Sequence, residues 1–363
     1  MTSDIQTQVQ AEVDRLVDSG AERGLQVAVY RDGEQVVDAV AGVADPATGR
    51  PLTSETPIYC FSVCKAAAST LVHMLVEQGV LSYETRVAEV WPELGARGKG
   101  AVTVRQVLNH SAGVPQVPPD TTIEDLCDWD GICARIAGQE LWWEPGTKVG
   151  YHAYTFGYIL GEVIRRTTGK RISELLEERI AAPLGVSGEL YFGMPASEHH
   201  RLAVLEDAPM AGPMPEMPPD LPMFRAAPMS LMPTAALGNR EDVLAADIPA
   251  GGKCSARAIA RLYAALLGPV DGVRLIPEPR LREATAVSTS GPDQVFGMDT
   301  RWGLGYSIGV MGVPEQDPPV AFGVGGVGGS FAGADRARGL TFAVTKNRLA
   351  MDFSSATEII GRL

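Results

Sequence analysis

The sequence predicts an α+β fold, in which an antiparallel sheet is flanked by helices and a mainly helical lobe lies between the two halves of the sheet. Strand-like runs occur near both ends of the 363-residue chain, whereas residues 80–205 read mainly as helices and loops. Strands that are distant in sequence can bury their apolar faces by joining one sheet covered by helices. We therefore expect residues 1–80 and 240–363 to form an α/β lobe and residues 81–239 to form the helical lobe.

The N-terminal elements are predicted to be a helix followed by a β-hairpin. Apolar residues recur at helical spacing over residues 5–18. Residues 25–30 and 34–44 are β-rich and flank Asp32-Gly33, a dipeptide typical of tight hairpin turns. These two strands should therefore be neighbours in the sheet.

Residues 62–76 are predicted to form a buried helix. The segment is apolar nearly all round until Glu77 and Gln78. A helix without a polar face belongs in the centre of a domain. Further helices are expected at 103–108, 155–166, 172–180 and 255–267. The β-rich runs of the C-terminal part are 303–311, 319–324, 330–335 and 340–347, and a last helix closes the chain.

Residues 208–233 have an unusual composition. They hold eight of the 26 prolines and six of the 12 methionines. Proline at this density precludes a regular helix or a central strand. Long irregular loops are often lids or binding loops, and methionine adapts to varied apolar ligands. We expect this loop to contribute to substrate selectivity, the alternative being a poorly ordered surface loop.

Composition excludes several classes of protein. The net charge is −13, and no basic run is present that could neutralise nucleic-acid phosphates or bind an anionic membrane. The N-terminus lacks the basic start and apolar stretch of a signal peptide, so we expect a cytoplasmic protein. Five cysteines without CxxC spacing, and histidines away from zinc-ligand spacing, predict reduced thiols and no metal site. No cofactor is expected.

Ser62 and Lys65 are the first candidate catalytic pair. Their three-residue spacing puts both side chains on one helix face. Serine becomes a nucleophile when a base takes its proton, and a lysine desolvated by apolar neighbours can be that base. A serine near a helix N-terminus also experiences the positive end of the helix dipole. The spacing alone is equally typical of an N-cap serine followed by a surface lysine.

Tyr151 is the second candidate. It follows a Pro145-Gly146 turn and precedes the helix predicted at 155–166. The reference pKa of a phenol, about 10, is close to that of lysine. Two groups so matched can share a proton, so that either serves as base or acid. Without the other motifs, Tyr151 reads as a core or interface aromatic residue.

The glycine-rich run 322–330 is the third candidate. Glycines between two β-runs let the backbone approach a ligand closely. An edge strand here could give one N–H to an oxyanion hole, with the Ser62 N–H as the other. Gly323, Gly325 and Gly328 also fit GxGxxG, but a dinucleotide loop needs a following helix, and residues 330–335 read as a strand.

Taken together, these motifs resemble the serine β-lactamase and penicillin-binding-protein superfamily, and most closely the class C-like family VIII carboxylesterases and related acyltransferases. The resemblance covers most of the chain and includes residues 104–115, 151–170, 180–186 and 248–266. It implies a β-lactamase-like fold with a cleft between its lobes. It also implies a serine acyl-enzyme on Ser62, with Lys65 and Tyr151 as catalytic partners, and it assigns an oxyanion N–H to Val327.

Two positions depart from the pattern of that family. Ala153 stands where β-lactamases of this class have the asparagine of Tyr-x-Asn, and Val324 stands where the third motif usually has lysine or histidine. A cation that would bind a β-lactam carboxylate is therefore absent from position 324. We expect poor β-lactamase activity and an apolar or neutral acyl group.

The predicted function is that of a serine hydrolase or transacylase, most simply a carboxylesterase, acting on a small ester or activated acyl substrate. Alternatives are an acyltransferase that passes the acyl group to an alcohol or amine in a biosynthetic pathway, and an idle ligand-binding protein on the same scaffold. The oligomeric state is left open. The predicted site consists of the catalytic residues Ser62, Lys65 and Tyr151, and of the oxyanion or substrate-binding residues Gly325, Gly326, Val327 and His152.

Overall fold

A nine-stranded antiparallel sheet forms the base of the molecule in the computed structural model, which describes residues 2–209, 218, 220–317 and 319–363. The strand order is β3-β2-β1-β13-β12-β11-β10-β9-β8, so strands from both ends of the chain meet in the middle of the sheet, as predicted. The strands are β1 (Gly24–Arg31), β2 (Glu34–Asp45), β3 (Arg50–Pro51), β8 (Thr289–Pro292), β9 (Asp299–Trp302), β10 (Ser307–Ile308), β11 (Ala321–Gly325), β12 (Phe331–Asp335) and β13 (Leu340–Lys346).

The junction between the two ends of the chain is the β1–β13 pair. Its register runs from Leu25 opposite Lys346 to Arg31 opposite Leu340. Strands β1 and β2 form the predicted hairpin, and the turn residues Asp32 and Gly33 have φ angles of 50° and 87°. Positive φ at both central residues is what a tight hairpin turn requires, and Asp and Gly tolerate it.

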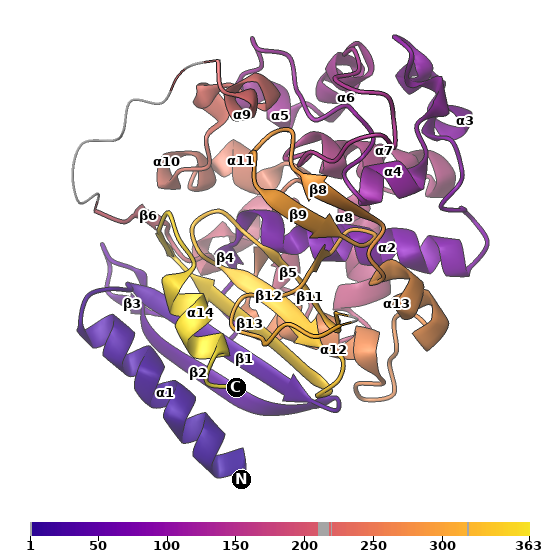
Figure 1. The fold of residues 1–363 in the computed structure, drawn as a ribbon. Helices are drawn as coiled ribbons and strands as arrows, with labels where there is room; N and C mark the ends of the chain where they lie inside the picture. The colour runs from indigo at the N-terminus through magenta and orange to yellow at the C-terminus, as the bar shows by residue number, and fades with distance from the viewer. Residues whose placement is uncertain (1, 210–217, 219, 318) are drawn as a thin grey trace.

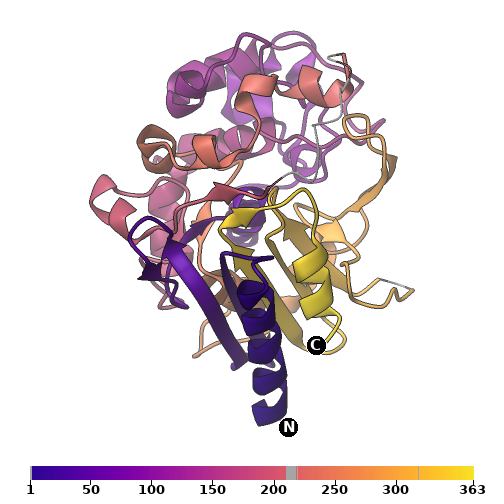
Figure 2. The same ribbon diagram turned by 90° about the vertical axis from the view of Figure 1, so that its left-hand side faces the viewer.

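Helices cover both faces of this sheet. On one face, α1 (Thr2–Asp18) and α14 (Ser354–Ile360) bury Val13 and Ile359 against Val27 of β1. On the other face, α12 (Ala256–Leu267) and the buried α2 (Lys65–Glu77) pack in a second cluster that includes Ala28. Figures 1 and 2 show α1 and α14 side by side on the same face. Alternate residues of β1 thus serve two cores.

The remaining helices gather above the sheet as drawn in Figure 1. They are α3 (Val87–Val90), α4 (Val104–Leu108), α5 (Ile123–Cys127), α6 (Trp129–Ala137), α7 (Thr155–Thr168), α8 (Ile172–Leu176), α9 (Pro222–Ala226), α10 (Ala235–Gly238) and α11 (Glu241–Ala245), with α13 (Glu278–Ala284) beside α12. Helix α11 contacts α5 although it follows residue 240. The lobe boundaries at 80 and 240 therefore stay a prediction.

Two small sheets connect these parts. Strands β4 (Ile58–Tyr59), β7 (Lys253–Cys254) and β5 (Leu190–Tyr191) form an antiparallel sheet in the order β4-β7-β5. Strands β6 (Glu206–Asp207) and β14 (Arg348–Leu349) pair in parallel. The first of these sheets ends directly before the segment that carries Ser62.

Two expectations need correction, and one hairpin was not expected. The run 303–311 yields only the two-residue β10, because Gly305 and Gly309 take positive φ angles on either side of it. The hairpin β8–β9 was not predicted. The loop 208–233 does contain a short helix, α9, because Pro222 occupies its first turn, where no amide hydrogen is needed. Residues 210–217 and 219 of that loop lie outside the described residues.

Candidate active site

Ser62 lies in a short 3₁₀ turn, Phe61–Cys64, that leads directly into α2. The preceding residue, Phe61, has a φ angle of +48°, which is uncommon for a bulky residue. Its ring stacks on Tyr59 of β4 at 4.6 Å. The sharp turn leaves Ser62 9% exposed at the N-terminal end of the central helix. The serine thus lies between β4 and α2, largely buried but with a small part of its surface accessible.

Lys65, the first residue of α2, is buried against Ser62. Its Nζ lies 2.9 Å from Ser62 Oγ and 2.6 Å from the carbonyl oxygen of Ala250. Within the described residues it has no carboxylate partner. Burial lowers the pKa of Lys65 from 10.5 to about 7. A substantial fraction of this lysine is therefore neutral near pH 7 and able to accept a proton.

Tyr151 comes from the predicted turn after α6. Pro145 and Gly146 occupy its central positions, Gly146 has a φ angle of +86°, and the Thr147 amide donates to the carbonyl of Glu144. The ring of Tyr151 lies 5.1 Å from Lys65 Nζ. Burial raises the pKa of Tyr151 to about 12, and a hydrogen bond with Ser62 opposes this rise. The phenol therefore keeps its proton at neutral pH.

The glycine-rich segment approaches the turn of Ser62 from the sheet. Strand β11 ends at Gly325, and a Cβ on Gly326 would overlap the carbonyl oxygen of Cys60. Only glycine permits this approach. The next residue, Val327, is 47% exposed, and its amide has no hydrogen-bond partner among the described residues. An unused N–H is thus available beside the serine turn.

His152 does not share this exposed position. It is fully buried, its Nδ1–H donates to the Gly150 carbonyl at 2.6 Å, and its Nε2 accepts from the Val114 amide at 3.1 Å. Burial lowers its pKa to about 4, so the ring is neutral. With both nitrogens occupied, His152 ties the Tyr151 segment to the segment that contains Val114.

Several neighbours of the site were not predicted. The Ala250 carbonyl contacts Lys65 from a segment 185 residues away in the sequence, so no local pattern predicts this contact. His110 has a φ angle of +61°, and its ring lies 4.8 Å from that of Tyr151 with 43° between the ring planes. Its Nδ1 accepts from the His152 amide at 3.1 Å, and its buried Nε2 has no partner among the described residues. The third neighbour, Asp293, accepts a hydrogen bond from the Tyr151 amide at 2.8 Å.

The described part of the proline- and methionine-rich loop packs beside the Tyr151 segment. The Tyr154 hydroxyl donates to the Leu231 carbonyl at 2.6 Å, and the Val117 amide donates to the Ala226 carbonyl at 3.0 Å. Arg225 lies over the ring of Trp142 at 4.8 Å. Residues 220–233 thus pack against the segment that contains Tyr151 and are hydrogen-bonded to it through Tyr154.

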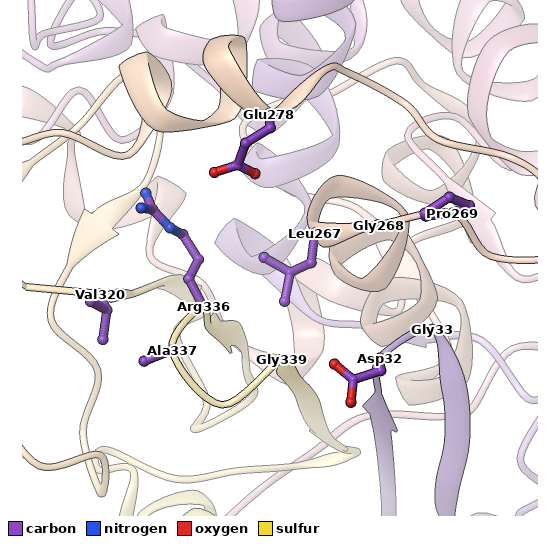
Figure 3. Close-up of a pocket in the computed structure, with 10 residues that line it drawn as sticks. All are labelled: Asp32, Gly33, Leu267, Gly268, Pro269, Glu278, Val320, Arg336, Ala337 and Gly339. Atoms are coloured by element: carbon purple, nitrogen blue, oxygen red, sulfur yellow. The ribbon is translucent and has the colours of Figure 1, made fainter.

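A separate hollow of about 490 Å³ opens at the opposite end of the sheet (Figure 3). Gly33 and Gly339 line it beyond the ends of β1 and β13 that lie farthest from Leu25 and Lys346. The side chains of Asp32, Glu278 and Arg336 face it in Figure 3. It contains none of the predicted catalytic residues, so the surroundings of Ser62 remain the candidate active site.

The described residues contain neither a candidate metal site nor a candidate membrane-spanning helix. No group of three or more His, Cys, Asp or Glu side chains there is arranged to hold a metal ion. None of the helices described combines the length and the apolar composition needed to cross a bilayer.

Comparison with known protein families gives one match that spans the chain. Residues 9–361 match the Beta-lactamase family. Esterase/beta-lactamase LipL of Mycobacterium tuberculosis is 33% identical over 350 residues, which cover 90% of this chain and 77% of that protein.

Solved structures agree with this match. The crystal structure of a family VIII carboxylesterase has a TM-score of 0.89 and 35% identity, and the likeness covers 99% of this chain and 96% of the other. EstCE1, described as a hydrolase with promiscuous acyltransferase activity, has a TM-score of 0.78 over 99% of this chain and 98% of its own, at 19% identity. The last likeness is one of fold.

Proposed function

Because this chain belongs to the beta-lactamase family and is a serine hydrolase or transacylase of that fold, we propose that Ser62 is its nucleophile, with Lys65 and Tyr151 as the proton-transferring groups. The observation that supports this assignment most directly is the 2.9 Å separation of Ser62 Oγ and Lys65 Nζ, where the lysine has no carboxylate partner in the part of the chain that the structure describes. A lysine in an ion pair would stay protonated and could not act as base.

In the acylation step, neutral Lys65 takes the proton of Ser62 as its Oγ attacks the acyl carbonyl. The Tyr151 phenol, whose pKa burial raises to about 12, gives a proton to the leaving alkoxide. Tyr151 recovers its proton from Lys65, so the site returns to its starting charge. The products of the step are an ester on Ser62 and a free alcohol.

The oxyanion of the tetrahedral intermediate needs hydrogen-bond donors. The Val327 amide, which has no partner in the described residues, and the Ser62 amide at the start of the 3₁₀ turn supply them in this proposal. Gly326 allows the segment after β11 to approach the turn closely enough for both amides to serve, whereas a Cβ on Gly325 would meet the ring of Phe353. The overlap that a Cβ on Gly326 would cause supports this role.

The acyl group that suits this site is neutral and apolar. Position 324, where a cation would bind a substrate carboxylate, holds a buried valine. Beside the catalytic tyrosine, Phe296 is 46% exposed and its ring lies 5.8 Å from that of Tyr151. Val327 adds a second exposed apolar side chain. Small uncharged esters are therefore the proposed substrates.

The acyl-enzyme is resolved by an acceptor that Lys65 or Tyr151 deprotonates. Water makes the protein a carboxylesterase, and a bound alcohol or amine makes it an acyltransferase. We propose water as the default acceptor, because the relatives with similar sequences carry esterase or carboxylesterase names. A cytoplasmic location is proposed with it, because all five cysteines are free thiols, as is usual in a reducing compartment.

The experiment is intact-protein mass spectrometry after incubation with p-nitrophenyl butyrate, for wild type, Ser62→Ala and a control, Ser69→Ala. Ser69 lies in α2, the helix that follows the turn of Ser62, and donates a hydrogen bond to the Lys65 carbonyl at 2.9 Å. Ser69→Ala therefore removes a nearby serine hydroxyl, as Ser62→Ala does, but keeps the proposed nucleophile. We expect turnover or a butyryl adduct in wild type and Ser69→Ala, and neither in Ser62→Ala. Ester cleavage that survives in Ser62→Ala would contradict the assignment.

Added alcohols and amines then identify the acceptor. A new ester or amide product, formed at the expense of the free acid, would mark a transacylase. A wild-type protein that gives neither turnover nor adduct with any ester would match the idle binding scaffold instead.

A further inference from the structure

The Asp293 side chain binds three backbone amides next to the catalytic groups. Its Oδ2 accepts from the Tyr151 amide at 2.8 Å, and its Oδ1 accepts from the amides of Val295 and Phe296, both at 2.8 Å. The first of these bonds joins residues 142 positions apart. One carboxylate thus ties the tyrosine segment to the hairpin β8–β9.

Burying the carboxylate of Asp293 costs free energy of folding unless other groups compensate its charge. Asp293 is 4% exposed and has no cationic partner among the described residues. Burial raises its pKa, and the three amide hydrogen bonds oppose that rise. A buried carboxylate requires such compensation, and the compensation holds only while all three amides stay in place.

The same hairpin surrounds the Tyr151 ring. Trp302 of β9 stacks on it at 5.7 Å, with 23° between the ring planes, and Phe296 lies 5.8 Å away. The Gln294 amide donates to the Val149 carbonyl at 2.9 Å, two residues before the tyrosine. The edge of the sheet therefore fixes both the backbone and the ring of Tyr151.

We infer that Asp293 is the positioning residue for Tyr151: it fixes the backbone from which the phenol reaches Ser62. This inference rests on the proposed function, because it takes Tyr151 to be a proton-transferring group at Ser62. Asp293 itself is assigned no contact with substrate. Catalytic groups lose much of their effect when displaced by about 1 Å, so breaking one anchoring bond near the reacting atoms should lower the rate strongly. Substrate affinity should change little.

Two variants separate the bond to Tyr151 from the turn of the hairpin. Asp293→Asn keeps the shape, but if its oxygen continues to serve Val295 and Phe296, its NH₂ group faces the donating Tyr151 amide. Asp293→Ser is too short to reach Tyr151, while its hydroxyl can still accept from an amide two residues on, as serine does in turns. The matched control is Asp299→Asn, which removes an exposed carboxylate from β9 of the same hairpin.

The measurements are the rate of fluorophosphonate labelling of Ser62 and the steady-state constants for a p-nitrophenyl ester. We expect both Asp293 variants to lower the labelling rate and kcat at least tenfold with KM within about twofold, and Asp299→Asn to match wild type. Unchanged rates in a folded Asp293→Asn or Asp293→Ser protein would overturn the inference. Circular dichroism reports folding of each variant, and the serine variant serves if the asparagine variant does not fold.

A double-mutant cycle with Tyr151→Phe tests whether Asp293 acts through the tyrosine. If it does, Asp293→Asn causes little further loss in the Tyr151→Phe protein. An equal fold loss in both backgrounds would show that Asp293 acts elsewhere, and the inference would fail. Full activity of Tyr151→Phe alone would instead refute the proposed role of the tyrosine, so the two failures are distinguishable.

Discussion

Lys65 and Lys253 are both buried, but their hydrogen-bond partners give them different roles. Burial lowers the pKa of both Lys65 and Lys253 to about 7. Lys65 contacts a hydroxyl and a single carbonyl. Lys253 contacts three carbonyls, those of Phe192 at 2.5 Å, Leu244 at 3.0 Å and Val243 at 3.3 Å. The first environment leaves the amine free to exchange a proton, and the second uses all of its hydrogens.

The pH dependence of activity should report Lys65. Only the neutral amine can act as base, so kcat/KM for a neutral ester should rise with pH, with a midpoint near the Lys65 pKa of about 7. The Tyr151 proton, held by a pKa of about 12, does not limit this window. Arginine cannot deprotonate in this range, so Lys65→Arg should lose activity at every pH. An active Lys65→Arg enzyme, or a flat profile from pH 5 to 9, would contradict a lysine base.

At pH 10, stability should respond in opposite directions when the two lysines are replaced by methionine. The folded-state pKa of Lys65 lies below its unfolded value of 10.5, so the unfolded chain binds more protons between about pH 7 and 10.5, and the stability contribution rises with pH across that window. Lys65→Met removes this cost and should raise Tm at pH 7, with a smaller gain at pH 10.

Lys253→Met removes the same charge cost at pH 7, but it also leaves three buried carbonyls without a donor. At pH 10, where little of the charge cost remains, it should therefore lower the free energy of unfolding by about 3 kcal/mol. Thermal melts of both variants at pH 7 and pH 10 provide the measurement. A Lys253→Met protein stabilised at pH 10 would mean that the three carbonyls find other partners.

At the scale of elements, the end of β11 controls the distance between the sheet and the serine turn. A Cβ on Gly326 would overlap the Cys60 carbonyl, so Gly326→Ala should push the Val327 amide away from Ser62. Loss of one oxyanion donor costs about 100-fold in kcat or more, and we expect a fall of that order. Gly268→Ala is the control, because Gly268 has an extended φ of −160° and open space where its Cβ would lie. Equal kcat values for the two variants would contradict the model of the oxyanion site.

Elements whose pattern is local were predictable from the sequence. The first hairpin, the helix from Ala256 to Leu267 and strands β12 and β13 follow from apolar periodicity and turn residues. The hairpin β8–β9 was missed because Gly291 and Pro292 interrupt β8, and its residues become strands only by pairing at the sheet edge. Helix α9 does not follow from composition, because a high proline content argues against a helix only where proline falls in its interior, and Pro222 occupies the first turn.

The same distinction applies to the candidate site. The spacing of Ser62 and Lys65 predicts their contact because both belong to one turn of chain, and the structure brings their polar atoms to 2.9 Å. The neighbours of Tyr151 could not be predicted in this way. Asp293 reaches it from a segment 142 residues later, and nothing in the sequence around Asp293 distinguishes it from any acidic turn residue.

At the scale of the whole molecule, the charge of the protein should select among esters. The net charge is −13, and position 324 offers no cation to an incoming carboxylate. An anionic ester such as p-nitrophenyl hemisuccinate should therefore have a lower kcat/KM than the neutral butyrate. The long-range part of this difference should shrink when ionic strength rises from about 10 to about 150 mM, because the Debye length falls from about 30 to about 8 Å. A preference for the hemisuccinate would point to a cation in the cleft and would contradict the proposed substrate class.

The pairing of β1 with β13 also determines when, during synthesis of the chain, the enzyme can complete its folding. A ribosome makes Leu25 more than 300 residues before its partner Lys346, so β1, an interior strand of the sheet, has an open edge during almost the whole of translation. The segment with Ser62 emerges early too, yet the strand that ends beside it, β11, comes close to the end. Contacts of such long sequence separation slow folding and leave unpaired strand edges exposed in the meantime. Activity should therefore appear only after the last strands are released, and until then we expect the nascent chain to be prone to aggregation through the open edge of β1.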